Sequence, residues 1–165
     1  MYTFIIETDL GAMQAAAEDN VLRGLWFIGQ KYFPRDTKTW IEKPDYPVFV
    51  SLSSWLKDYF SGRKPGIHIP LSPDGTDFQQ AVWKLLLEIP YGKTSTYGAI
   101  AARLAAARGR GEKKVPAQAT GGAVGHNPIT LLIPCHRVLG SDGSLTGYAG
   151  GLEKKQALLE LEKAL

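Results

Sequence analysis

The sequence predicts an α+β fold in two parts, a small β-sheet with one helix followed by a mainly helical domain. Short β-rich runs occur in the first 33 residues, whereas apolar side chains at helical spacing dominate after residue 75. The charge also changes along the chain: residues 1–82 hold 8 Lys/Arg against 10 Asp/Glu, and residues 83–165 hold 11 against 6. We therefore expect two domains, residues 1–72 and 73–165.

The first domain shows strand and helix patterns in turn. Residues 2–6 and 21–28 are rich in β-branched and aromatic side chains, which favours strands. Residues 14–18 are a weaker strand candidate between them, because alanine is uncommon in strands. Residues 48–60 carry apolar side chains at helical spacing, and the proline-containing stretch 66–75 predicts an extended linker.

The second domain opens with a helix start signal. Thr76 followed three residues later by Gln79 forms a capping box, in which the two side chains bind the first free N–H groups of a helix that ends before Pro90. Four further elements are expected: a helix at 97–107 capped by Thr94 or Ser95, a helix at 117–124 with Pro116 as its first residue, a strand at 129–133, and a closing helix at 152–165.

The three helices of this domain, with their connections, form the skeleton of a helix-turn-helix-like module. The third helix is unusual because Gly121 and Gly122 stand next to each other in it, and each glycine costs about 1 kcal/mol in a helix interior. Such glycines serve either a close approach of the backbone to another molecule or tight packing between helices. The sequence leaves both interpretations open.

Basic residues gather in one glycine-containing segment before the third helix. With Glu112 as their only acidic neighbour, they raise the local potential and favour binding of a polyanion through counterion release. The alternative is a solvated surface loop. These residues are Arg103, Arg108, Arg110, Lys113 and Lys114.

Composition excludes several classes of protein. A single cysteine cannot form an internal disulfide, which makes the reducing cytoplasm the expected compartment. One cysteine and three histidines are a poor ligand set for zinc, so we expect no metal and no cofactor. The longest apolar stretches are far shorter than a membrane helix, and the acidic N-terminus lacks the pattern of a signal peptide.

The candidate nucleophile is Cys135, because its neighbour His136 is the side chain best suited to accept a proton near neutral pH. Neighbouring side chains on an extended backbone point to opposite faces, so the pair needs a bend or a bridging water. Glu162 is the carboxylate we favour for orienting the imidazole. The alternative is an inert core cysteine, since free cysteine is among the most buried residue types.

Several motifs resemble the O6-alkylguanine-DNA alkyltransferases. The resemblance is dense over residues 72–162 and looser over residues 1–71. It implies a ribonuclease H-like first domain and a winged helix-turn-helix-like second domain that carries the active site. The matching segments are Thr76-Asp77-Phe78-Gln79-Gln80-Ala81-Val82-Trp83, Ile89-Pro90-Tyr91-Gly92-Lys93-Thr94, Ala123-Val124-Gly125-His126-Asn127-Pro128, Ile133-Pro134-Cys135-His136-Arg137-Val138 and Gly147-Tyr148-Ala149-Gly150-Gly151-Leu152.

The resemblance implies a single-turnover transfer of an alkyl group from O6-alkylguanine, and O4-methylthymine, in double-stranded DNA to Cys135. A Cys135–water–His136–Glu162 relay would activate the thiol. The helix-turn-helix would bind the minor groove, and Tyr97 would bind the base that is flipped out of the stack into a pocket. The implied substrate-binding residues are Val138, Tyr148, Asn127 and Ala149. The implied DNA-binding residues are Thr96, Ala117, Gln118, Gly121 and Gly122. The family also implies a monomer without a cofactor.

Gln118 departs from the family pattern, because it stands where many members carry an arginine finger. Glutamine keeps hydrogen-bonding capacity but lacks the charge and the stacking guanidinium. Arg137 we interpret as a structural residue that holds the two halves of the protein together. Two other functions remain as alternatives: a sensor that binds alkylated DNA without repairing it, and a Cys-His hydrolase, for which an adjacent pair has the wrong geometry.

Overall fold

A computed structural model describes residues 1–109 and 115–165, which form two compact units. The first unit contains Met1–Asp74 together with Pro128–Thr130, and the second contains Gly75–Asn127 and Leu131–Leu165. Strands dominate the first unit and helices the second, so the expected α+β class is confirmed. Among the described residues, no helix is long and apolar enough to cross a membrane.

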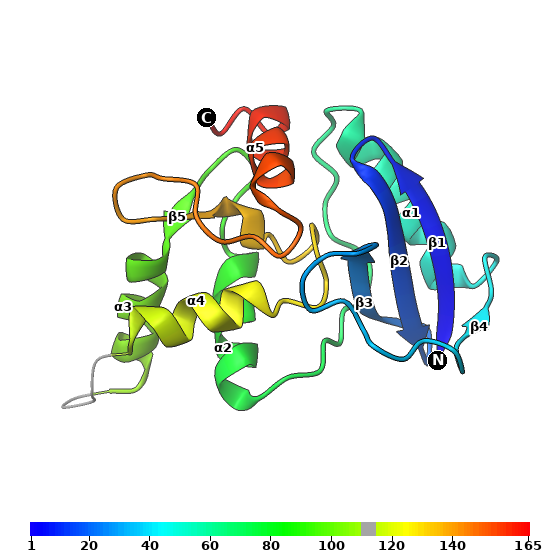
Figure 1. Ribbon diagram of the computed structural model, residues 1–165, viewed down its shortest axis with the longest axis horizontal. Coiled ribbons are helices and arrows are strands. Elements are labelled where there is room, and N and C mark those ends of the chain that lie inside the picture. The colour runs from blue at the N-terminus through cyan, green and yellow to red at the C-terminus, as the bar shows by residue number, and fades with distance from the viewer. Residues whose placement is uncertain (110–114) are drawn as a thin grey trace. The chain divides into compact units, whose positions relative to one another are not determined.

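The first unit is a four-stranded sheet in the order β3-β2-β1-β4. Strands β1 (Tyr2–Thr8), β2 (Gly11–Glu18) and β3 (Val21–Phe27) form an antiparallel meander, and the short β4 (Ile41–Glu42) runs parallel to β1. Helix α1 (Pro47–Phe60) packs against β1 and β2 (Figure 1). The weak strand candidate at residues 14–18 is thus part of the central strand.

Aromatic side chains build the core of this unit. Phe49 of α1 is fully buried and lies 6.2 Å from Phe4 of β1 between ring centroids. The indole of Trp26 lies so close to Gly24 that an added Cβ would meet it at 1.9 Å, and it stacks on Trp40 at 6.1 Å. Only glycine at position 24 leaves room for this indole, which explains a glycine in the middle of a strand.

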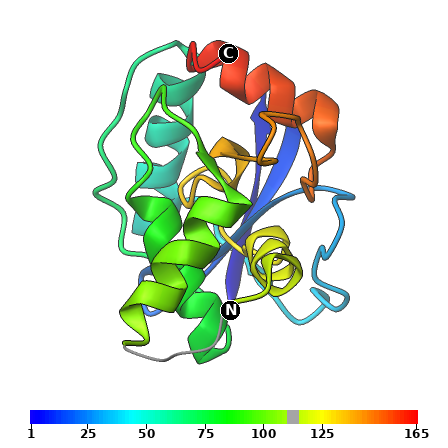
Figure 2. The same ribbon diagram turned by 90° about the vertical axis from the view of Figure 1, so that its left-hand side faces the viewer.

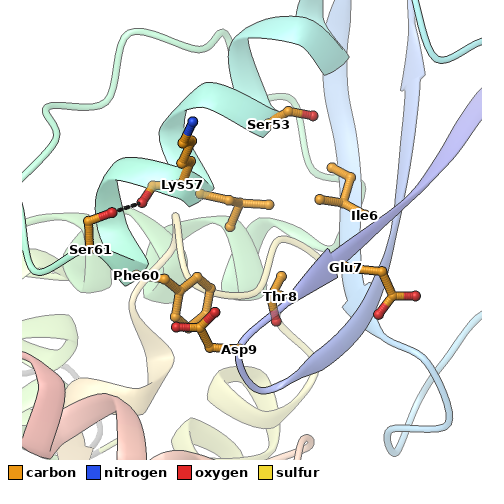
Figure 3. Close-up of a pocket in the computed structure, with 9 residues that line it drawn as sticks. Ile6, Glu7, Thr8, Asp9, Ser53, Lys57, Phe60 and Ser61 are labelled. Carbon is orange, nitrogen blue, oxygen red and sulfur yellow. Dashed lines mark hydrogen bonds between the residues drawn. The ribbon is translucent and has the colours of Figure 1, made fainter.

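A surface hollow of about 340 Å³ lies between the β1–β2 turn and α1 (Figure 3). Its lining residues include Glu7, Asp9 and Lys57. None of its nine lining residues is a candidate site residue, so this hollow is separate from the chemistry expected at Cys135.

The second unit is built on three helices, α2 (Asp77–Leu87), α3 (Tyr97–Ala107) and α4 (Ala117–Gly125), each in contact with the other two. The predicted capping box at the start of α2 is present with both of its hydrogen bonds. Trp83 of α2 donates from its indole N–H to the Ala123 carbonyl at 2.9 Å, which ties α2 to α4.

The remaining elements of this unit carry the candidate site. The 3-10 helix η1 (Cys135–Arg137) leads directly into β6 (Val138–Leu139), which pairs in parallel with β5 (Ser95–Thr96). Helix α5 (Leu152–Leu161) packs against η1. Figure 2 shows α5, in red, at one end of the unit and α3 and α4 toward the other.

Three local expectations were wrong. The cap of α3 is Thr96, whose hydroxyl accepts from Ala99 N–H at 3.0 Å, rather than Thr94 or Ser95. Pro116 is the cap of α4 rather than its first residue. The closing helix ends at Leu161, four residues before the end of the chain. The two cap positions differ by only one or two residues, which is the usual uncertainty at a helix end.

The strand expected at residues 129–133 is also absent. Ile129 forms an isolated bridge with Leu25, and the chain then turns at Leu131, whose φ is +75°. Few non-glycine residues adopt this left-handed conformation. Leu131 is also the residue at which the chain passes from the first unit, which contains Pro128–Thr130, to the second.

Candidate active site

Cys135 is the first residue of η1, and only 6% of it is exposed. The tight 3-10 turn replaces the extended backbone that the sequence suggested at this point. The preceding turn is braced by Asn127, whose side-chain N–H donates to the Ile133 carbonyl at 2.7 Å. A second hydrogen bond links the Asn127 side chain to Cys135. Asn127 therefore fixes the backbone just before the turn and also contacts the thiol itself.

His136 and Glu162 form a fully buried pair, although 26 positions separate them in the sequence. The imidazole Nε2 lies 2.6 Å from Glu162 Oε2. Burial lowers the pKa of His136 against the opposing effect of Glu162, so the ring is neutral near pH 7. Nε2 then carries the hydrogen and donates to the carboxylate, which leaves Nδ1 as a proton acceptor.

The Nδ1 atom of His136 is buried and has no hydrogen-bond partner among the described residues. A buried nitrogen without a partner costs free energy, and a catalytic role or an ordered water is a common explanation for such an atom. The predicted water between Cys135 and His136 would satisfy this atom.

Arg137 shares the same carboxylate. Its Nε donates to Glu162 Oε1 at 2.7 Å and its Nη2 to Oε2 at 3.1 Å, while Nη1 donates to the Ile89 carbonyl at 2.7 Å. All three bonds lie within the second unit. The expectation that Arg137 holds the two halves of the protein together was therefore wrong.

Lys155 is a residue of the candidate site that the sequence analysis did not single out. Its side chain is completely buried, and Nζ donates to the carbonyls of Val138 at 2.5 Å, Thr146 at 2.9 Å and Gly147 at 3.3 Å. Desolvation lowers its pKa to about 8. One signal could have revealed it: Lys155 precedes Leu158 and Leu159 by three and four positions, which places a lysine on the apolar face of the closing helix.

The pKa of the Cys135 thiol depends in part on the charge of this lysine. Burial raises the pKa of Cys135, while the Asn127 hydrogen bond and the positive charge of Lys155 lower it. A buried thiol is a poor nucleophile until it loses its proton. The site therefore combines a protonated nucleophile, a neutral base and a cation that favours the thiolate.

Tyr97 begins α3 and reaches the loop that precedes α5. Its hydroxyl donates to the Thr146 carbonyl at 2.8 Å, with the Gly147 carbonyl at 3.2 Å. Burial raises the pKa of Tyr97, and the charge of Cys135 acts in the same direction. Tyr97 and Lys155 thus hold the same two carbonyls, in the loop that also carries the half-buried Tyr148 and Ala149.

The five candidate DNA-binding residues border this cluster at Tyr97, because Thr96 directly precedes it and Gly121 lies beside its ring. Thr96 caps α3, and the others lie along α4, where Ala117 and Gln118 are exposed in the first turn. A Cβ added at Gly122 would meet nothing within 4 Å, and one at Gly121 would make an ordinary contact with Tyr97 at 3.9 Å. Helix packing therefore requires neither glycine, which favours the alternative of a close approach by another molecule.

Comparison with known families covers both units. The model of the 6-O-methylguanine DNA methyltransferase DNA binding domain matches residues 77–164, and that of the ribonuclease-like domain of the same family matches residues 1–73. The chain belongs to this family. The ribonuclease-like assignment of the first unit agrees with the expected fold class.

Relatives match over nearly the whole chain. A methylated-DNA–protein-cysteine methyltransferase of Mycobacterium tuberculosis is 44% identical over 159 residues, covering 96% of this chain and 90% of the relative. Its counterpart in Methanosarcina barkeri is 43% identical over 163 residues, covering 99% and 98%. The crystal structure of M. tuberculosis OGT in complex with DNA aligns with a TM-score of 0.87 at 40% identity, covering 99% of this chain and 94% of that one.

Proposed function

We propose that this protein repairs alkylated DNA directly, by moving the alkyl group from O6 of guanine to its own Cys135 in one irreversible turnover. O4-methylthymine is a second proposed substrate. The observation that carries the proposal is the unpaired Nδ1 of a neutral, buried His136, backed by Glu162 and next in sequence to the protein's single cysteine.

The chemistry begins with a proton transfer. The Cys135 thiol gives its proton through a bridging water to His136 Nδ1, and Glu162 balances the charge of the resulting imidazolium through the bond to Nε2. The positive charge of Lys155 favours the thiolate that remains. His136, Glu162 and Lys155 each act on the thiol from a position that is closed to bulk water, where electrostatic effects are strong.

The thiolate then attacks the alkyl carbon in line with the bond to O6. A C–S bond forms, the C–O bond breaks, and the departing guanine keeps the electron pair and accepts a proton from the Tyr97 hydroxyl. The product is a thioether, which is a poor leaving group, so nothing within the site regenerates the thiol. Each molecule therefore acts once.

The reaction requires the base outside the duplex, because O6 is out of reach in stacked DNA. We propose that α4 enters the minor groove, where Gly121 and Gly122 allow its backbone to approach the sugar-phosphate chain. Ala117, Gln118 and Thr96 provide the flanking contacts. The bare exposed surface at Gly122 supports this orientation.

The flipped base would lie between η1 and the loop before α5. The Val138 carbonyl has a second lone pair beside its bond to Lys155 and can accept from the guanine amino group. Tyr148 and Ala149 would form a wall of the pocket. The Tyr97 hydroxyl must leave the Thr146 carbonyl to reach the base, and Lys155 still holds that carbonyl when it does.

A protein that depends on a free thiol belongs in a reducing compartment, and we propose the cytoplasm. All proposed catalytic groups come from one unit of one chain, which supports action as a monomer.

The decisive experiment is peptide mass spectrometry after incubation with a duplex oligonucleotide that contains O6-methylguanine. Trypsin releases residues 115–137 as one peptide. We expect stoichiometric methylation of Cys135 in this peptide and no further transfer with excess DNA. The Cys135→Ala protein should bind the duplex as the native protein does but accept no methyl group. Binding without any modified peptide from the native protein would overturn the repair proposal in favour of a damage sensor.

A further inference from the structure

Two cationic or basic groups compete for one buried carboxylate. Glu162 accepts from His136 Nε2 on Oε2 and from Arg137 on both oxygens. The His136 and Glu162 side chains have no exposed surface, and that of Arg137 is 11% exposed. Arg137 binds both oxygens of the carboxylate, and its guanidinium stays protonated. The single negative charge of Glu162 is therefore already balanced before His136 takes up a proton.

This sharing changes what a proton on His136 costs. While the imidazole is neutral, Arg137 and Glu162 balance each other. When the imidazole gains a proton, two positive charges face a single carboxylate in a buried place, where the repulsion is poorly screened. Arg137 therefore opposes protonation of the group that must accept the thiol proton.

Arg137 is also held in place independently of Glu162. Its Nη1 donates to the Ile89 carbonyl just after α2, and its guanidinium lies 5.7 Å from the ring centre of Tyr91. The guanidinium cannot follow a change at Glu162 without losing these contacts. Its effect on the pair is therefore a constant feature of the fold.

We propose that Arg137 is a positioning residue that keeps His136 a weak base and so keeps Cys135 as a thiol in the protein without DNA. This role rests on the proposed function, in which Cys135 gives its proton through water to His136 Nδ1. A nucleophile that is used only once gains from this restraint, since a standing thiolate reacts with oxidants and stray alkylating agents.

The other charges near His136 are accounted for. Lys155 on α5 acts in the same direction as Arg137, and burial has the largest effect on lowering the pKa of His136. Glu162 acts in the opposite direction, as a charged Cys135 would. Tyr91, which also faces Glu162 and Arg137, has a raised pKa because of burial and stays neutral below about pH 10.

The test is an NMR titration of His136 in the protein alone, where neither DNA nor alkyl transfer enters the result. We expect a native midpoint below 6.5, and a rise of at least about one pH unit in Arg137→Gln, assigned to the His136–Glu162 pair as a whole. Arg137→Lys keeps the charge and should restore most of the native midpoint. Arg63→Gln breaks an exposed arginine–carboxylate pair of the first unit and should change nothing.

A second readout follows the thiol. Reaction with iodoacetamide at about pH 8 should be up to about tenfold faster in Arg137→Gln, because a stronger base draws more thiolate from Cys135. A variant that melts like the native protein but keeps both the native midpoint and the native iodoacetamide rate would reduce Arg137 to a structural role. If Arg137→Gln does not fold, a native midpoint above 6.5 is sufficient to overturn the inference.

The two proposals can fail separately. A shifted midpoint together with no methyl transfer from the oligonucleotide would refute the repair function and leave the inference about Arg137 intact. Methyl transfer with an unshifted midpoint would do the reverse.

Discussion

The two units place their ionisable groups differently. In the first unit the buried side chains, apart from that of Thr130, are apolar, and the ion pairs, such as Arg63 with Asp58, lie at the surface. In the second unit His136, Lys155 and Glu162 lie inside, together with the thiol of Cys135. Buried charge is costly even when paired, so a core of this kind indicates chemistry rather than stability. The core of the first unit, in contrast, is built by the packing of apolar side chains.

Removing a core aromatic side chain should have the largest effect on the free energy of unfolding, and this effect should not depend on pH. Phe49→Ala deletes a fully buried ring that packs on Phe4 and Tyr46. We expect a loss of about 3–5 kcal/mol in the free energy of unfolding, measured by urea denaturation. The loss should be the same at pH 6 and pH 8, because the contacts that are lost are apolar ring contacts; a strong pH dependence would contradict the comparison.

Removing the buried cation should have a smaller effect that depends on pH. Lys155→Met takes away the charge that lowers the pKa of Cys135, so this pKa should rise and the pH profile of methyl transfer should move to higher pH. If the Cys135 pKa rises by about one pH unit, the rate on the rising part of the profile falls about tenfold. Rapid-quench kinetics on the methylated oligonucleotide measure it.

Lys154→Met is the matched control, since Lys154 is the half-buried neighbour on the same helix. A rate reduced equally at every pH in Lys155→Met would mean that the lysine only holds the carbonyls of Val138, Thr146 and Gly147.

Adding a charge on the outside of the second unit should change DNA binding modestly. Gln118→Arg places a cation in the exposed first turn of α4. One new phosphate contact should make the slope of log affinity against log salt steeper by about 0.9 for duplex DNA. An unchanged slope in fluorescence anisotropy titrations would indicate that position 118 does not face the phosphates.

Removing a helix cap should have the smallest effect. Thr76→Ala deletes the hydroxyl that accepts from Gln79 N–H at 3.1 Å. We expect the free energy of unfolding to fall by about 1 kcal/mol and the methyl transfer rate to stay unchanged. A loss of methyl transfer with unchanged stability would contradict this expectation, because it would show that the cap of α2 affects the active site directly.

Features that depend on neighbouring residues could be predicted from the sequence. The capping box of Thr76 and Gln79 formed as predicted, because its bonds span only three positions. The motif around Cys135 identified the family without any structure. The extents of α1, α2 and α3 followed from apolar spacing to within one to three residues.

Features that depend on residues far apart in the sequence emerged only when the chain was folded. Arg137 could not be matched to Glu162 from 25 positions away, nor could a lysine on α5 be matched to carbonyls of β6 and the preceding loop. A turn at Leu131, where the chain passes from the first unit to the second, replaced the strand expected at residues 129–133. Local propensity indicates which secondary structure a segment favours. Burial and the surrounding charges, which depend on the tertiary structure, decide its final conformation and the chemistry of its side chains.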